Sequence, residues 1–228
     1  PHPIQYQVPW FRALAARSGL DLTVGFGCLP GPEEQGIGFG VPFAWDVPLL
    51  DGYRWEELRR WGRPRFGSFG AIRLRGVAAW LRRQAPDALL VTGWSSLSLV
   101  QAALAARRSG IPVIARGDSQ AGERPLRRRL LLRLLLRLYS AFLVVGASNR
   151  RFYEQLGVPA ARLFPCPHFV DNDRFAAAAA ELGPRRAELR AWWGLAEGRT
   201  VFLFAGKLEP KKRPLDLVQA AARARAEG

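Results

Sequence analysis

A regular alternation of helical and strand patterns, beginning at Ile72, constrains the fold more than any other feature of the sequence. Each helical pattern leads into a short apolar run with strand character. We expect helices at residues 73–84, 96–108 and 125–138, and strands at 88–91, 111–115 and 141–145. Strands that are separated by helices form right-handed βαβ units with parallel strands. The sequence therefore predicts an α/β fold with a parallel sheet.

Polar, glycine-containing segments follow the three predicted strands. They are Thr-Gly-Trp-Ser at 92–95, Arg-Gly-Asp-Ser at 116–119 and Gly-Ala-Ser at 146–148. The carboxyl ends of parallel strands meet at one edge of the sheet, and ligands of such folds bind outside that edge. We therefore expect a candidate cleft there, facing a later lysine-containing loop if two domains close on each other.

That later loop contains all three lysines of the chain, Lys207, Lys211 and Lys212. The apolar run Val201–Ala205 before it predicts a buried strand, and Pro214 after it suits the first position of a helix. A helix start offers backbone N–H groups and the positive end of the helix dipole, which favour a phosphate or diphosphate. The alternative interpretation is a solvated charged turn.

The pattern Gly-Lys-Leu-x-x-x-Lys, followed by Pro-Leu-x-Leu-x-x-Ala, resembles the donor-diphosphate loop of the retaining GT-B glycosyltransferases of family four, the glycosyltransferases group one. The resemblance implies that Gly206, Lys207 and Lys212 hold the diphosphate of a nucleotide-diphosphate sugar. It also implies transfer of a sugar with retention of configuration and two Rossmann-like domains. No cofactor or metal is expected, because basic side chains and helix dipoles neutralise the leaving diphosphate.

The amino-terminal stretch His-Pro-Ile-Gln-Tyr-Gln-x-Pro-x-Phe-Arg-Ala-Leu-Ala is similar to the loop and helix after the first strand of many members of that family. The resemblance implies an acceptor side that includes His2, Gln5, Tyr6, Gly93 and Trp94. Many relatives carry a Gly-Gly pair where this chain has Gln-Tyr-Gln. The alternative is a capped helix start with a solvent-exposed histidine.

Asp118 stands where many relatives carry a polar residue near the acceptor hydroxyl. A buried carboxylate at this position could accept a proton from that hydroxyl or orient it, which makes Asp118 the candidate catalytic residue. The alternative interpretation is an Asx turn or a helix cap before Pro125.

The segment from Ala147 to Phe175 is similar to the one that joins the two domains in this family. We therefore predict an N-terminal, acceptor-side domain at 1–170, and a crossover with the start of a C-terminal nucleotide-sugar-binding domain at 171–228. Ala176–Ala180, Gly183 and Pro184 are typical of a hinge, and residues 185–193 predict a helix. We also expect a fragment that lacks the first strand and most of the second domain, and that is inactive alone.

The net charge of +15 and the pI near 11.3 imply attraction to polyanions. The 31 arginines are spread along the chain without an RNA-binding or zinc-finger signature, so nucleic acid is not the expected partner. A non-catalytic basic domain that binds nucleic acid or anionic lipid remains the alternative function. Cys28 and Cys166 have no metal-ligand spacing and suit a reducing, cytoplasmic location.

Residues 127–138 form a run of arginine and leucine in which Arg129, Arg133 and Arg137 recur at intervals of four. One interpretation is a buried helix whose arginine stripe faces water. The other is an amphipathic helix lying on anionic lipid, with arginines reaching toward the headgroups. The second interpretation would make the protein peripheral at the inner face of the membrane, with a sugar, a lipid-linked molecule or another small molecule as acceptor.

Overall fold

The computed structural model of the chain describes residues 2–35, 40–63 and 68–226. The chain divides into two compact units. Unit 1 comprises Pro1–Gly31 and Trp45–Val170, and unit 2 comprises Pro32–Ala44 and Asp171–Gly228.

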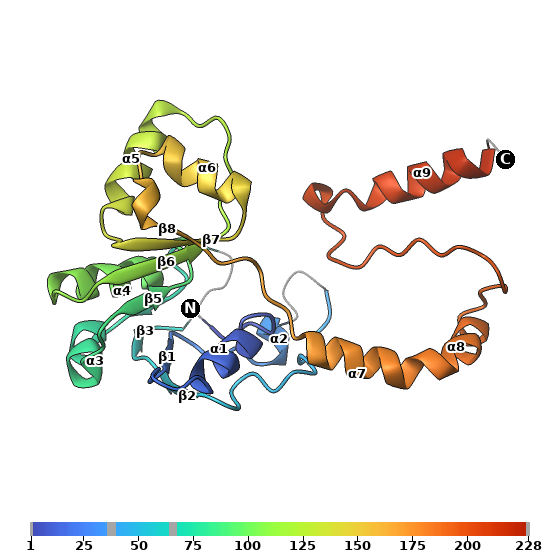
Figure 1. Ribbon diagram of the computed structural model, residues 1–228, viewed down its shortest axis with the longest axis horizontal. Helices are drawn as coiled ribbons and strands as arrows, with labels where there is room; N and C mark the ends of the chain where they lie inside the picture. Colours follow the sequence, from blue (N-terminus) through green and yellow to red (C-terminus); the bar gives the residue numbers. More distant parts are fainter. Residues whose placement is uncertain (1, 36–39, 64–67, 227–228) are drawn as a thin grey trace. The chain divides into compact units, whose positions relative to one another are not determined.

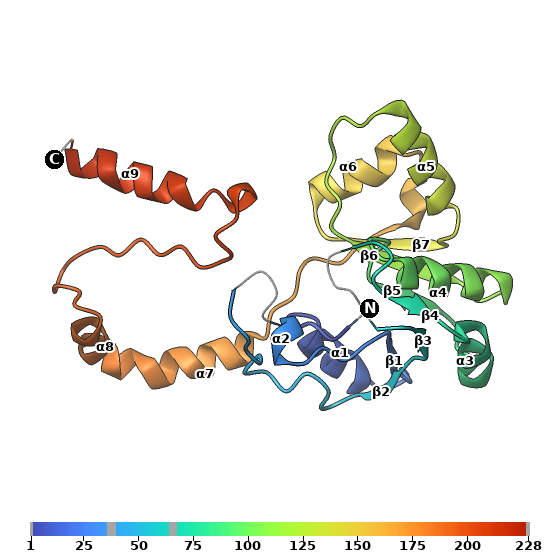
Figure 2. The same cartoon turned by 180° about the vertical axis from the view of Figure 1, so that it is seen from behind.

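The centre of unit 1 is a four-stranded parallel sheet in the order β5-β6-β7-β8 (Figures 1 and 2). Its strands are β5 (Leu89–Val91), β6 (Val113–Gly117), β7 (Ala141–Val144) and β8 (Leu163–Pro165). The connections are α4 (Leu97–Arg108), α5 (Leu126–Leu136), and α6 (Ala147–Gln155) with the short η1 (Ala160–Arg162). Unit 1 is therefore an α/β, Rossmann-like domain, which confirms the predicted fold class.

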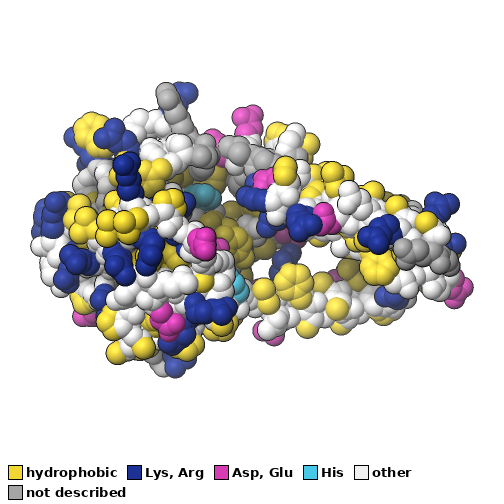
Figure 3. Space-filling view, turned by 90° about the horizontal axis from the view of Figure 1, so that it is seen from above, with side chains coloured by type: hydrophobic (Ala, Val, Ile, Leu, Met, Phe, Trp, Pro, Cys, Tyr) yellow, Lys and Arg dark blue, Asp and Glu magenta, His cyan; other side chains and the backbone are white. Residues whose placement is uncertain are grey.

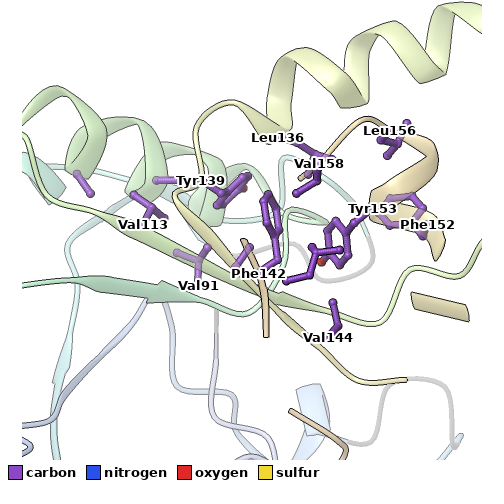
Figure 4. Close-up of a cluster of buried hydrophobic side chains, with 14 of the residues drawn as sticks. Val91, Val113, Leu136, Tyr139, Phe142, Val144, Phe152, Tyr153, Leu156 and Val158 are labelled. Carbon is purple, nitrogen blue, oxygen red and sulfur yellow. The ribbon is translucent and has the colours of Figure 1, made fainter. Parts of the chain in front are cut away.

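The core of unit 1 forms between the sheet and its helices (Figure 4). The largest fully buried side chains include Tyr139, Phe142, Phe152 and Tyr153. Phe142 and Tyr153 pack with their ring centroids 4.6 Å apart, and Tyr153 contacts Phe152 edge to face at 5.1 Å. These aromatic contacts fasten α6 to β7, one of the two inner strands of the sheet.

The amino-terminal part of unit 1 begins with α1 (Val8–Ala15) and β1 (Thr23–Phe26), and β1 pairs in parallel with β2 (Arg54–Glu57). Phe11, Phe26 and Tyr53 form an aromatic cluster with centroid distances of 5.4 to 6.4 Å. This cluster holds α1 against the β1–β2 pair. A short antiparallel pair, β3 (Arg60–Trp61) and β4 (Arg73–Leu74), leads into α3 (Val77–Gln84).

The described residues of unit 2 are helical or irregular. The helices are α2 (Pro32–Gln35), α7 (Asn172–Leu182), η2 (Gly183–Arg185), α8 (Arg186–Trp192), η3 (Pro210–Lys212) and α9 (Pro214–Ala226). The segment predicted to be a hinge forms the continuous helix α7 with η2 behind it, because its alanine run has the highest helix propensity. The predicted start of a helix at Pro214 is confirmed.

The predicted buried strand at Val201–Ala205 is wrong. This segment has no regular secondary structure, and Phe202 and Leu203 are 76% and 84% exposed. A strand needs a partner for its backbone N–H and C=O groups, and the described part of unit 2 contains no other strand. An apolar run therefore does not become a strand here.

One local prediction in unit 1 also needs correction. The helix expected from Arg73 begins only at Val77, because Arg73 and Leu74 pair with β3 as a strand. The cap residue of α6 is Gly146, and the hydroxyl oxygen of Ser148 accepts a hydrogen bond from the backbone N–H of Ala121 at 3.3 Å.

Candidate functional site

The carboxyl ends of β5 and β6 place Gly93 and Trp94 beside Gly117. Gly93 is buried and has a φ of 99°, a left-handed conformation that favours glycine. The ring of Trp94 stacks on Phe152 at 5.9 Å and 15° and contacts Tyr153 at 6.1 Å. An added Cβ at Gly117 would lie 3.6 Å from both the Trp94 ring and the Tyr153 hydroxyl. Trp94 thus supports this edge of the sheet from the core.

Arg116, at the end of β6, connects the sheet edge to the amino-terminal helix. Its guanidinium carbon lies 5.1 Å from the ring centroid of Trp10 in α1, and one terminal nitrogen donates to the backbone oxygen of Pro167 at 3.3 Å. Its Nε is buried without an acceptor among the described residues. The sequence placed Arg116 in the segment after the strand but gave no reason to single it out.

The charges of Asp118 and Arg116 both act on the Tyr6 phenol. Partial burial raises the pKa of the Tyr6 phenol, the Asp118 carboxylate raises this pKa further, and the Arg116 guanidinium opposes the increase. Tyr6 therefore stays a neutral hydroxyl near pH 7. Asp118 is exposed, so the expectation of a buried carboxylate is wrong: the residue comes directly after the last residue of β6 and is not part of the sheet.

Asp118 is also not the cap of the next helix, because α5 has Pro125 at its cap position. The Gln120 side chain donates a hydrogen bond of 2.8 Å to the backbone oxygen of Asp118. The Asp118 carboxylate takes no part in this hydrogen bond. An exposed carboxylate beside a phenol and a guanidinium can orient a hydroxyl-bearing ligand through hydrogen bonds.

Gln5 lies on the turn that leads into α1, and His2 lies in the irregular segment before this turn. His2 is half-buried rather than fully exposed, and burial lowers its pKa to about 4, so the imidazole is neutral near pH 7. The backbone oxygen of Ile4 accepts hydrogen bonds from Gln7 and Val8 at 2.9 and 3.2 Å, which closes the turn around Gln5. Gln7 takes the cap position of α1 without a side-chain cap bond.

Asn149 holds the loop that carries Asp118, a role that the sequence did not reveal. The side chain is 1% exposed. Its Nδ2 donates to the backbone oxygen of Ser119 at 2.6 Å, and its Oδ1 accepts from the backbone N–H of Val145 at 3.1 Å. The backbone oxygen of Ser148 adds a bond of 3.1 Å from Ala121 N–H. The sequence signal that could have indicated this anchor is an asparagine in the first turn of the helix that follows β7, where its amide can reach nearby backbone groups.

The lysine loop in unit 2 is organised by local backbone contacts. The N–H of Glu209 donates to the oxygen of Lys207 at 2.8 Å, and the N–H of Lys212 donates to the oxygen of Glu209 at 2.9 Å. Arg213 takes a left-handed φ of 52° directly before α9 begins. Gly206 and Lys212 are exposed and Lys207 is half-buried, so the loop that holds the predicted diphosphate contacts is accessible.

Glu209 is the carboxylate among these lysines. Lys211 Nζ lies 3.0 Å from Glu209 Oε2, and this hydrogen bond is the main reason why the pKa of Glu209 is lowered. The charges of Lys207 and Lys212 lower the pKa further. The Lys211 ammonium is therefore engaged with the Glu209 carboxylate.

Two further properties of the described residues bear on the chemistry. In residues 2–35, 40–63 and 68–226, no group of three or more His, Cys, Asp and Glu side chains is placed to hold a metal ion. The helices in the same ranges are too short or too polar for any one of them to cross a membrane.

The comparisons with known proteins bear on unit 1. The family described as "Glycosyl transferase 4-like domain" matches residues 5–167, which include the sheet edge with Tyr6, Arg116 and Asp118 but not the lysine loop. No curated protein matches the chain. Since the matched region covers most of the sequence, the chain belongs to the family of proteins with a glycosyl transferase 4-like domain.

Proposed function

We propose that the protein is a glycosyltransferase that moves a sugar from a nucleotide-diphosphate sugar to a hydroxyl acceptor, with retention of anomeric configuration. Membership of a glycosyltransferase family supports transferase chemistry with a sugar donor and an acceptor. The observation that carries the proposal is the position of Arg116 and Asp118 at the carboxyl end of β6, inside the matched region, with the Arg116 guanidinium 5.1 Å from the ring of Trp10 in α1. Ligands of parallel α/β sheets bind at that edge.

The acceptor side of the proposed reaction is assigned to this sheet edge. The Asp118 carboxylate would accept a hydrogen bond from the acceptor hydroxyl, and it could take the proton as the new glycosidic bond forms. Tyr6 and the neutral His2 would add hydrogen-bonding groups for the rest of the acceptor. Gln5 lies on the turn next to them, while Gly93 and Trp94 shape the edge from behind.

The donor side is assigned to the lysine loop. Negative charge grows on the diphosphate as its bond to the anomeric carbon breaks, so an ammonium beside it stabilises the transition state more than the ground state. Lys207 and Lys212 would supply this charge, and Gly206 would let the backbone approach the diphosphate. Lys211 is less suited, because its ammonium is already bonded to Glu209 at 3.0 Å.

The test is a transfer assay on the full gene product with a panel of nucleotide-diphosphate sugars and with monosaccharide and lipid-linked acceptors. The proposal expects one donor to be consumed in an acceptor-dependent way and the product to keep the donor's anomeric configuration, read by proton NMR. A product of inverted configuration would overturn the assignment of retention while leaving the transferase intact.

A non-catalytic basic domain would behave differently in the same experiments. Its affinity for single-stranded RNA or for anionic vesicles would fall steeply with salt, as counterion release requires. It would show no preference for any nucleotide sugar and no turnover. That combination of results would replace the proposed reaction with the binding function.

A further inference from the structure

The helix α5 exposes a leucine face to solvent. Leu126, Leu130, Leu131 and Leu134 are 55% to 67% exposed, whereas Leu136 is buried. At 100° per residue the four exposed leucines share an arc of about 140° on the helix. The expectation that this helix is buried with only its arginines in water is therefore wrong. The inward side is provided by Leu132, Leu135 and Leu136, which pack into the core.

The arginine stripe Arg129, Arg133 and Arg137 borders the leucine face on the side toward α6. All three side chains are exposed, and none of them makes an ion pair within the described part of the chain. Figure 3 shows an apolar band bordered by basic side chains on the top of unit 1, where α5 and α6 lie. The leucine face and the arginine stripe of α5 thus form one continuous surface.

Two open hollows lie on the other side of the arginine stripe, between α5 and the segment from α6 to η1. The first, of about 530 Å³, is lined by Arg124 and Arg129 together with Phe152, Leu156 and the carboxylate-bearing Glu123. The second, of about 270 Å³, is lined by Arg133, Arg137 and Arg162 around apolar side chains, and no carboxylate lines it. Each hollow therefore offers guanidinium groups above an apolar floor, a combination that suits phosphate esters attached to hydrocarbon.

We propose that this surface, the leucine face together with the arginine stripe of α5, docks the protein onto a membrane that contains anionic phospholipid. Five arginines and no carboxylate lie between Leu126 and Arg137, so the helix complements a negative surface. The leucine face enters the boundary between headgroups and acyl chains, and the arginine stripe reaches lipid phosphates. A nucleic acid would be bound by the arginines alone and would leave four exposed leucines unused.

This proposal goes beyond the transfer reaction and does not depend on it. It also fixes an orientation: α5 lies in the plane of the membrane, with its inward side still packed on the sheet. Vesicle binding is measured without donor or acceptor, so its failure would leave the proposed reaction untouched.

The experiment is co-sedimentation of the full gene product with vesicles of phosphatidylcholine alone or mixed equally with phosphatidylglycerol. Wild-type protein is expected to bind the mixed vesicles far more tightly. The triple variant Arg129→Gln, Arg133→Gln, Arg137→Gln should lose about a hundredfold in affinity, from roughly fivefold for each charge near the surface. The matched control is Arg82→Gln, Arg107→Gln, Arg108→Gln, which removes three exposed charges at the ends of α3 and α4 and should bind like wild type.

A second variant, Leu130→Gln, Leu131→Gln, Leu134→Gln, keeps every arginine and removes most of the exposed leucine face. It should fold, because these side chains are outside the core, and should bind mixed vesicles at least tenfold more weakly. Wild-type binding by this leucine variant would overturn the proposal. The proposal would also be overturned if the control variant at Arg82, Arg107 and Arg108 lost as much affinity as the variant of the arginine stripe. Tight binding of single-stranded RNA that depends on the arginine stripe but not on the leucines would instead assign the surface to nucleic acid.

Discussion

The sheet edge of unit 1 and the lysine loop of unit 2 were both predicted from short polar segments, yet they are built in different ways. The sheet edge rests on a core: Trp94 stacks on Phe152, and the buried Asn149 ties the Asp118 loop to β7. The lysine loop rests on backbone bonds between residues two to three apart, and its flanking apolar segment is exposed. Substitutions behind the first site should therefore change stability, whereas those in the second should change turnover without changing stability.

The largest expected effect comes from a pair of phenylalanines, one from each unit. Phe142→Ala removes a fully buried ring from β7 and should lower the free energy of unfolding by about 3–5 kcal/mol. Phe202→Ala removes a ring that is 76% exposed and should change the free energy of unfolding by less than about 0.5 kcal/mol. Urea unfolding followed by circular dichroism measures both. Similar losses in the two variants would mean that unit 2 has a packed core as well.

The second prediction separates turnover from stability in the lysine loop. Lys207→Ala and Lys212→Ala should each lower turnover by roughly ten- to two-hundredfold, from the loss of a charge-assisted contact of about 1.5–3 kcal/mol. Their combined effect should be less than additive because both act on one diphosphate. Unfolding curves should not change.

Two controls lie in the same loop. Lys207→Arg should be tolerated, because members of the resembled family use either residue. Lys211→Ala should matter little, since Lys211 is bonded to Glu209. If Lys211→Ala proves as damaging to turnover as Lys212→Ala in a folded protein, the assignment of the two diphosphate lysines is wrong.

Asn149→Ala tests the anchor of the sheet edge. The substitution leaves the N–H of Val145 and the C=O of Ser119 without their partner and should cost about 2 kcal/mol of unfolding free energy. Hydrogen exchange should also rise at Ala121, whose N–H is held by Ser148 next door. Arg151→Ala, an exposed substitution on the same helix, is the control. Equal stability of both variants would show that the loop does not depend on Asn149.

The smallest expected effect concerns Gly93. Its φ of 99° is unfavourable for a residue with a Cβ, so Gly93→Ala should cost about 1–2 kcal/mol, although the nearest atom to an added Cβ, the Arg116 oxygen, is 3.9 Å away. Gly70→Ala meets no atom within 4 Å and does not have a left-handed φ, so thermal unfolding should be unchanged. An unchanged melting temperature for Gly93→Ala would show that the backbone there relaxes freely.

Much of unit 1 was predictable because its strands are short apolar runs between helical patterns, and the rule for parallel sheets places the segments after them at one edge. The strand β8 was missed because Leu163–Pro165 is a short run that ends in a proline, a residue that argues against a strand inside a sheet. The outward face of α5 was not predictable, since leucines surround most of the helix and periodicity then does not tell which of them meet the core.

The site was predictable only in part, for similar reasons. The predicted topology indicated that Asp118 lies at the carboxyl edge of the sheet, but the exposure of its side chain depends on where β6 ends. The contact of Arg116 with Trp10 joins residues that are far apart in the sequence, and no local pattern announces such a contact. The strand expected at Val201–Ala205 failed because composition alone does not supply the neighbouring strand that pairing requires.

The most direct test of the proposed two-sided reaction is to measure nucleotide affinity and turnover together for Asp118→Asn in the full gene product. The variant keeps the shape of the side chain and loses the charge that would receive the acceptor's proton. We predict that turnover falls at least tenfold while calorimetry gives an unchanged affinity for the nucleotide sugar. An equal loss of turnover and nucleotide affinity, or no loss of turnover, would contradict the assignment of the acceptor to the sheet edge.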